Sequence, residues 1–410
     1  MKYVVTDQVV LMRVPEGPVA EYVRPFGNWA REQGYSLAAL RQRIRLAAGF
    51  SGWLGEKAVC PRVIGSQHCA RYLREREQRI RTGDRVSLRQ FVELLCREGV
   101  TRSEKASAAR LTPAEQCAQA FGRYLREERL LSEASQLNYV PFIRDFLTDR
   151  FGDGPIKLAR LDLSDVTGFV QRRAPGMHRK RAQLLVAGVR SFLRYARYRG
   201  EIRVDLATAV PSVANWAMPS IPRGIAADQV RQLLKRVDRG TAIGRRDYAI
   251  LLLLARLGLR ASEVVSLELG DIDWQAGYLS VRGKGGRRHQ LPLPKDIGEA
   301  IVAYLKRGRQ RCACRRVFLT SRAPLRGLAG PSSLDAVVSH ALVHSGVEAP
   351  TRGAHQFRHG LASEMLRRGA SLSEIGELLG HRSPETTKIY TKVDLAALRT
   401  LALPWPGGVR

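Results

Sequence analysis

The chain has no long hydrophobic run and few cysteines. Its longest apolar stretch, residues 248–255, is far shorter than the roughly 20 residues that a membrane-spanning helix needs. The N-terminal residues lack the apolar core and small-residue cleavage site of a signal peptide. The six cysteines show no regular framework, which suits a reducing compartment. We therefore expect a cytoplasmic protein that has no membrane partner.

Acidic residues are also scarce. Asp and Glu total 38 against 68 Lys and Arg, which leaves a formal charge of +30 and a pI near 10.8. The excess is spread along the chain, whereas a solvated face normally mixes both signs. It therefore predicts a polyanionic partner, nucleic acid ahead of an anionic membrane. The hydrophobic content of 44% is ordinary for a folded protein, and 410 residues suggest two or three domains.

Breaks in helical continuity suggest where those domains meet. Prolines and a glycine interrupt residues 209–224, which predicts a linker. The small, polar stretch 101–116 is a second, weaker boundary that ends in a Thr-Pro helix start. We therefore expect an N-terminal helical module at 1–105, a second helical domain at 112–208 and a third domain at 225–410.

The first two of these domains look alike. The stretch "FGNWAREQG" from Phe26 compares with "FGRYLREER" from Phe121, and "SLRQFVELLCREG" from Ser87 compares with "GVRSFLRYARYRG" from Gly188. The second pair repeats one apolar helical face at i, i+3, i+4 and i+7. Residues 20–100 and 115–205 are predicted to be two copies of one module. Two unrelated amphipathic bundles remain the alternative.

The third domain has a different pattern. A buried helix is expected to end at Gly258, and residues 277–294 read as two strands joined by a glycine-rich turn. Further helices follow. The predicted fold class is mainly α (α+β), with tandem helical domains followed by a helical domain that carries a small antiparallel sheet.

Several side chains in this domain can carry chemistry. Arg260 follows the glycine that ends the buried helix, and Glu263 lies three residues on, where it can hold the guanidinium. His355 and Arg358 share one helix face. His359 is expected on another face, in a structural or DNA-adjacent role. Gly360 has no firm explanation beyond close packing.

The last motif is "SLSEIGELLGHRSPETTKIY", residues 371–390. A capping box begins its first helix and Gly380 ends it, which places His381 at a fixed exit. Ser383 and Pro384 begin another short helix, and Tyr390 is expected on its exposed second turn. Lys284 lies in the mobile glycine turn of the hairpin. Each of these residues alone has an ordinary surface or structural interpretation.

Their order along the chain is more specific. The motifs "GLRASE" (258–263), "GKG" (283–285), "HQFRHG" (355–360) and "LLGHRSPETTKIY" (378–390) resemble those of the tyrosine recombinase or phage integrase family. The resemblance covers residues 225–400 closely. It covers 115–205 more loosely, as the family's SAM-like core-binding domain, whereas residues 1–105 carry no matching motif.

This resemblance implies a set of roles in DNA strand exchange. Tyr390 would be the nucleophile that forms a 3'-phosphotyrosyl bond, with Arg260 and Arg358 on the non-bridging phosphate oxygens. His381 would donate a further hydrogen bond, His355 would take the phenolic proton and Lys284 would protonate the departing 5' oxygen. Glu263 would support the first arginine. The two guanidiniums would favour the phenolate, and the scheme needs no metal or other cofactor.

One other cluster can be written as a metal site. Cys312, Cys314, His340 and His344 contain zinc-binding residue types, but the usual two-residue gap between the cysteines is missing. After Tyr390, three leucines at 395, 398 and 401 form a short apolar stripe. It can dock on a neighbouring protomer, as the family's terminal helix often does, or pack on its own domain.

The family resemblance predicts an enzyme that integrates, excises or transposes a mobile element. Double-stranded DNA would be its partner, within the nucleoid, and it would act as a homotetramer or with related recombinases. A dimer-resolving recombinase, a non-catalytic accessory subunit and a relaxing topoisomerase are the alternatives. The target sequence cannot be deduced from one chain.

Overall fold

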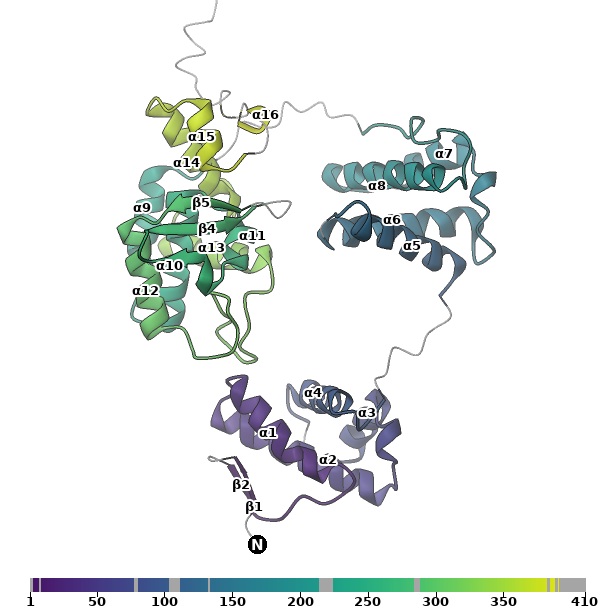
Figure 1. Cartoon of the computed structure of the whole chain (residues 1–410), viewed down its shortest axis with the longest axis vertical. Coiled ribbons are helices and arrows are strands. Elements are labelled where there is room, and N and C mark those ends of the chain that lie inside the picture. Colours follow the sequence, from purple (N-terminus) through teal and green to yellow (C-terminus); the bar gives the residue numbers. More distant parts are fainter. Residues whose placement is uncertain are drawn as a thin grey trace, which may run out of the picture. The chain divides into compact units, whose positions relative to one another are not determined.

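A computed structural model describes residues 3–6, 9–76, 80–102, 111–131, 133–213, 224–283, 288–381, 384–387 and 390. The chain forms two compact units, Lys105–Met218 in one, and Met1–Glu104 with Pro219–Arg410 in the other (Figure 1). The two segments of the second unit have separate hydrophobic cores. The predicted linker 209–224 lies largely outside the described residues.

The N-terminal segment is helical, with a small hairpin at its start. Its elements are β1 (Tyr3–Thr6), β2 (Val9–Leu11), α1 (Val23–Glu32), α2 (Leu37–Glu56), the 3-10 turn Pro61–Val63, α3 (Ser66–Glu75) and α4 (Asp84–Arg97). The antiparallel hairpin packs on α1 and α2 and was not predicted, because two such short strands carry little periodicity. Phe26, Phe50 and Phe91 lie fully buried between the helices.

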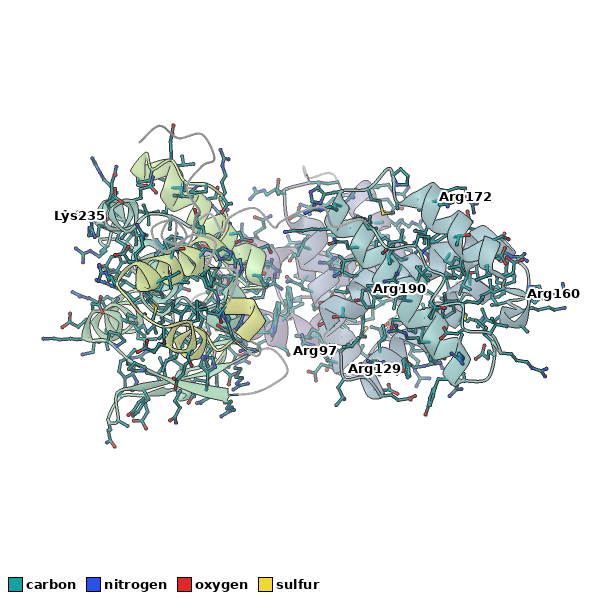
Figure 2. The ribbon with its side chains drawn as sticks, turned by 90° about the horizontal axis from the view of Figure 1, so that it is seen from above. Arg97, Arg129, Arg160, Arg172, Arg190 and Lys235 are labelled. Atoms are coloured by element: carbon teal, nitrogen blue, oxygen red, sulfur yellow. The ribbon has the colours of Figure 1, made fainter. Side chains whose placement is uncertain are left out.

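The middle unit contains four more helices. They are α5 (Pro113–Glu127), α6 (Glu133–Phe151), α7 (Leu163–Arg173) and α8 (Arg179–Tyr198), with the 3-10 turn Leu158–Arg160 before α7. The predicted helix start is confirmed, because Thr112 and Glu115 form a capping box around Pro113. Arg160 and Arg172 project outward from this unit (Figure 2), as expected for a strongly basic surface.

The C-terminal segment is helical around one small sheet. Its elements are α9 (Ala227–Arg236), α10 (Ala242–Leu257), α11 (Ala261–Ser266), β3 (Ile272–Asp273), β4 (Tyr278–Arg282), β5 (Arg288–Pro292), α12 (Lys295–Arg307), α13 (Pro331–Ser345), α14 (His355–Arg367), α15 (Leu372–Leu378) and α16 (Pro384–Thr387). The sheet is antiparallel in the order β3-β4-β5, which confirms the predicted strand pair.

Helix α10 forms the centre of this segment and packs against α9, α11, α12, α13 and α14 (Figure 1). This central position accounts for the apolar run in its sequence, since residues 249–254 are buried on every side of the helix. The predicted fold class, mainly helical with a small antiparallel sheet, is confirmed. No helix in the described ranges is long and apolar enough to span a bilayer.

Gly360 has a packing role. The backbone of residues 224–225 crosses α14 at this point, and the Ile225 N–H donates to the Gln356 carbonyl at 3.3 Å. A Cβ on Gly360 would lie 2.3 Å from the Ile225 carbonyl oxygen. The close packing expected at this glycine is therefore confirmed, and its partner is an extended backbone segment.

Candidate active site

Arg358 is the buried centre of the candidate site. Its side chain is 2% exposed and donates hydrogen bonds to the carbonyls of Gly258, at 2.8 Å, and Leu379. The guanidinium thereby joins the turn after α10 to the end of α15. Burial and the nearby positive charge of Arg260 lower the pKa of Arg358 to about 10, and it remains charged at neutral pH. Each terminal nitrogen keeps a second N–H for a ligand.

Arg260 is the N-cap residue of α11 and follows the left-handed turn at Gly258. Glu263 accepts two hydrogen bonds of 2.7 Å from it, one from the backbone N–H and one from the guanidinium. The arginine side chain is 30% exposed, whereas the carboxylate is buried. The contact expected between these residues is therefore present, and the buried negative charge offsets part of the positive charge of the two arginines.

Tyr390 is almost fully buried. Its side chain is 1% exposed and packs with Ala362, Ile375 and Leu379. The predicted exposure of Tyr390 is wrong, because the phenol lies inward. The expected effect of the two guanidiniums, which favours the phenolate, is present, but burial outweighs it. Burial raises the pKa of Tyr390 above its ordinary value, although the charges of Arg358 and Arg260 oppose that rise.

His359 contacts the phenol directly. Its Nδ1 lies 3.0 Å from the Tyr390 Oη, so the expectation that His359 points to another face is wrong. Burial, reinforced by His355 and Arg358, lowers the pKa of His359 to about 4, which keeps the ring neutral at pH 7. A signal for this placement was available in the sequence, since His355 and His359 are one helical turn apart. Their ring centroids are 4.5 Å apart, with His355 on the exposed side.

His381 lies parallel to the tyrosine ring, at 6.3 Å between centroids and 4° between planes. Its Nδ1 is 2.7 Å from the buried Thr387 hydroxyl, a partner that sequence reasoning missed. When that hydroxyl donates, Nε2 carries the ring proton and can donate to a ligand. Burial, then Arg358 and Arg260, lower the pKa of His381 to about 4, so this hydrogen bond comes from a neutral ring.

Lys284 lies outside the described residues, although both strands of its hairpin are present. His289 of β5 lies against the turn before His381, since a Cβ on Gly380 would be 3.2 Å from the His289 ring. This contact was not foreseen. It brings one arm of the hairpin to the candidate site. The structure therefore brings together six of the predicted site residues, which are Arg260, Glu263, His355, Arg358, His381 and Tyr390. Three residues that were not predicted for the site also lie there, namely His289, His359 and Thr387.

The alternative zinc cluster does not assemble. Cys312 and Cys314 are free thiols, and the Cys312 Sγ lies 4.0 Å from the Cys314 carbonyl oxygen. His340 and His344 stack on each other on α13, 4.1 Å between ring centroids. Among the residues that the structure describes, no group of three or more His, Cys, Asp or Glu side chains is arranged to hold a metal ion.

Comparison with known proteins agrees with this geometry. The model of the phage integrase family matches residues 223–396, and that of the phage integrase N-terminal SAM-like domain matches residues 118–200. The integrase/recombinase y4rA of Sinorhizobium fredii (strain NBRC 101917 / NGR234) is 54% identical over 407 residues, 99% of each chain. The chain belongs to the phage integrase family of tyrosine recombinases. It is thus a site-specific recombinase, an enzyme that cleaves and rejoins DNA.

A second relative and two solved structures match smaller parts of this recombinase. Tyrosine recombinase XerD of Listeria innocua serovar 6a (strain ATCC BAA-680 / CLIP 11262) is 31% identical over 245 residues, 58% of this chain and 80% of XerD. The XerH recombinase bound to palindromic difH substrate superposes with a TM-score of 0.55 at 18% identity, over 72% of this chain and 97% of XerH. The Tn1549 transposon integrase superposes with a TM-score of 0.51 at 17% identity, over 70% of this chain and 99% of the integrase chain. At these identities the two structures establish the fold alone.

Proposed function

We propose that this recombinase cleaves double-stranded DNA by attack of the Tyr390 phenol on a phosphodiester. The Tyr390 oxygen forms a bond to phosphorus, the bond to the 5' oxygen breaks, and a 3'-phosphotyrosyl intermediate results. A 5' hydroxyl of a second strand reverses the step without an external energy source. The observation that supports this most is the 3.0 Å contact of the phenol with His359, beside two arginines whose charges act on it.

The two arginines stabilise the transition state. Negative charge builds on the non-bridging oxygens as phosphorus becomes five-coordinate, so cations that are already in place lower the barrier. Arg260 is partly exposed and fixed by Glu263, and Arg358 is fixed by two backbone carbonyls. Both guanidiniums are thus held in position before DNA arrives. His381 adds a neutral hydrogen bond from Nε2, with Thr387 fixing its ring.

His359 accepts the phenolic proton when DNA is bound, because the negative charge of the phosphate opposes the burial and the positive charge of Arg358 that lower the pKa of His359. In the tautomer that carries its proton on Nε2, the ring has a free pair of electrons on Nδ1, which faces the Tyr390 hydroxyl. This assignment replaces the role expected for His355, which lies farther out and passes the proton from His359 towards solvent. Lys284 supplies the proton that the 5' oxygen gains on departure. Proton loss from tyrosine and proton gain by the leaving group are thereby balanced.

Access to the phenol requires the packing around Tyr390 to open when DNA binds. Tyr390 is 1% exposed, and a buried oxygen cannot reach a phosphate on the surface. We infer that this opening keeps the contact between the phenol and His359, and that the phosphate enters beside Arg260, which is already partly exposed.

We propose three functional domains, 1–105, 112–208 and 225–410, with 209–224 as the linker. The separate cores of the three segments support this division, as do the family matches at 118–200 and 223–396. The enzyme acts within the nucleoid as a homotetramer or with related recombinases, and integrates, excises or transposes a mobile element. The lambda integrase dimer bound to a core site is a solved example of two copies on DNA.

Dimer resolution is the second candidate that the family resemblance allows. The match to tyrosine recombinase XerD covers 58% of this chain, whereas the y4rA match covers 99% and includes the N-terminal segment. A full-length match to an integrase/recombinase therefore makes mobility of a DNA element the first candidate. The non-catalytic accessory role considered from the sequence is disfavoured by the family match.

The decisive experiment traps the covalent intermediate. Purified protein is mixed with a duplex that carries the ends of the DNA element encoding it, nicked beside the expected cleavage point so that religation fails. Wild type should form an adduct that survives denaturing electrophoresis, and Tyr390→Phe should form none. Tyr278→Phe, which changes an exposed tyrosine of β4, is the control and should react normally. DNA binding without an adduct in any variant would favour the accessory role.

A further inference from the structure

The described residues of 20–102 and 113–213 contain the same succession of α-helices. Each segment has four, with a short 3-10 turn between the second and third, and the first segment has an additional 3-10 turn, Ala20–Tyr22, before α1. In both segments the second helix packs against the other three, and the third packs against the fourth. The helix order and the helix neighbours are therefore the same, which is the result that a duplicated module requires.

The first two helices approach each other at equivalent glycines. A Cβ on Gly27 of α1 would lie 3.1 Å from Ile44 Cδ1 of α2, and a Cβ on Gly122 of α5 would lie 3.1 Å from Val140 Cγ2 of α6. In both cases the residue opposite on the second helix is β-branched, and in the first segment Val5 of β1 also lies 2.9 Å from the same Gly27 Cβ position. The same close helix contact therefore recurs at the same place in the two segments.

Two aromatic contacts also recur in the two segments. In each segment one aromatic pair joins the first and fourth helices, and another joins the second and third helices. The pairs and their ring-centroid separations are Phe26–Phe91 (5.0 Å) and Phe50–Tyr72 (5.3 Å) in the first segment, and Phe121–Phe192 (5.4 Å) and Phe146–Phe169 (5.1 Å) in the second. The two cores are thus built on matching contacts between matching helices, beyond a general likeness of helical bundles.

The fourth helices end in the same way. Gly99 after α4 has φ 74° and Gly200 after α8 has φ 73°, both in the left-handed region. In each case the next residue donates a backbone hydrogen bond of 2.9 Å into the last helical turn, Val100 to Leu95 and Glu201 to Ala196. A shared helix order, shared core contacts and a shared cap together indicate one module present twice.

The first copy carries unpaired positive charge on its outer surface. Arg41 and Arg45 are exposed and one turn apart on α2, and within the described part of the chain neither side chain forms an ion pair or hydrogen bond. By contrast, Lys57 pairs with Glu75, and Arg89 pairs with Glu93. Adjacent arginines without acidic partners attract a polyanion, and their spacing along a helix suits neighbouring phosphates.

We propose that residues 20–102 are a second SAM-like module, and that it binds the phosphate backbone of duplex DNA through the α2 surface of Arg41 and Arg45. It contacts a stretch of DNA additional to the one held by residues 112–410, and so lengthens the bound site. This proposal rests on the proposed function only for the choice of DNA as ligand.

The test measures how DNA binding depends on salt. Each phosphate contact contributes about 0.9 to the slope of log K against log salt, so Arg41→Gln/Arg45→Gln should lower that slope by about 2 on a long duplex. Footprinting should show loss of an outer protected segment. The double variant Lys57→Gln/Arg89→Gln removes the same charge from ion-paired side chains and should leave both readings close to wild type.

A shorter duplex separates this proposal from the catalytic one. On DNA trimmed to the central protected segment, Arg41→Gln/Arg45→Gln should form the Tyr390 adduct at the wild-type rate. An unchanged slope and footprint on the long duplex would overturn the second DNA contact. Loss of the adduct on the short duplex would also overturn it, because the arginines would then act on the central site. Failure of wild type to form any adduct would refute only the proposed chemistry.

Discussion

His359→Asn tests which histidine takes the proton from Tyr390. Asparagine can place its carbonyl oxygen near the position of Nδ1, where it accepts the 3.0 Å hydrogen bond but cannot accept a proton. The pKa of Tyr390 is raised by burial, so fewer than about one phenol in 10³ is ionised at pH 7 without a base. Loss of a general base typically costs about 10²–10⁴-fold in rate. We expect adduct formation to slow by that factor.

The assay is single-turnover adduct formation on the nicked duplex, with DNA affinity measured in parallel. His359→Asn should keep its affinity, and His355→Asn should slow cleavage by less than about tenfold, because an exposed relay can be replaced by water. A fluorinated tyrosine of lower pKa at position 390 should restore part of the rate lost in His359→Asn. A rate within threefold of wild type for His359→Asn, or a larger loss in His355→Asn, would refute the reasoning.

Three further predictions concern stability and the buried arginine. Gly360→Ala should lower the free energy of unfolding by about 1–3 kcal/mol in urea titrations, since its Cβ meets backbone, whereas Gly298→Ala, with 3.8 Å to its nearest neighbour, should raise it by up to about 1 kcal/mol. The folded pKa of about 4 for His359 and His381 lies below the ordinary ~6.5, so the unfolded chain binds more protons between these values. Stability should therefore fall as pH drops from about 6.5 to 4, and less so in His359→Asn/His381→Asn. Arg358→Lys should leave a carbonyl unpaired, at a cost of about 1–3 kcal/mol in urea titrations, and should slow adduct formation by about 10²-fold.

Local rules predicted most of the elements near the site. The helix start at Thr112, the Ser371 capping box, the helix end at Gly258 and the strand pair of residues 277–294 all depend on neighbours within a few positions. Such contacts are readable from spacing, because helix and hairpin geometry sets which neighbours meet. The hairpin of residues 3–11 escaped this reasoning because its strands are too short to show a period.

The sequence by itself determined the fold class, the basic surface and the residue types of a phosphate-handling site in one order along the chain. Only the tertiary structure decided how those residues meet. It turned His359 onto Tyr390, set Thr387 behind His381, and buried the phenol so that desolvation outweighs two guanidiniums. These outcomes depend on contacts between residues 6 to 31 positions apart and on the water that packing excludes, and neither is encoded in local spacing.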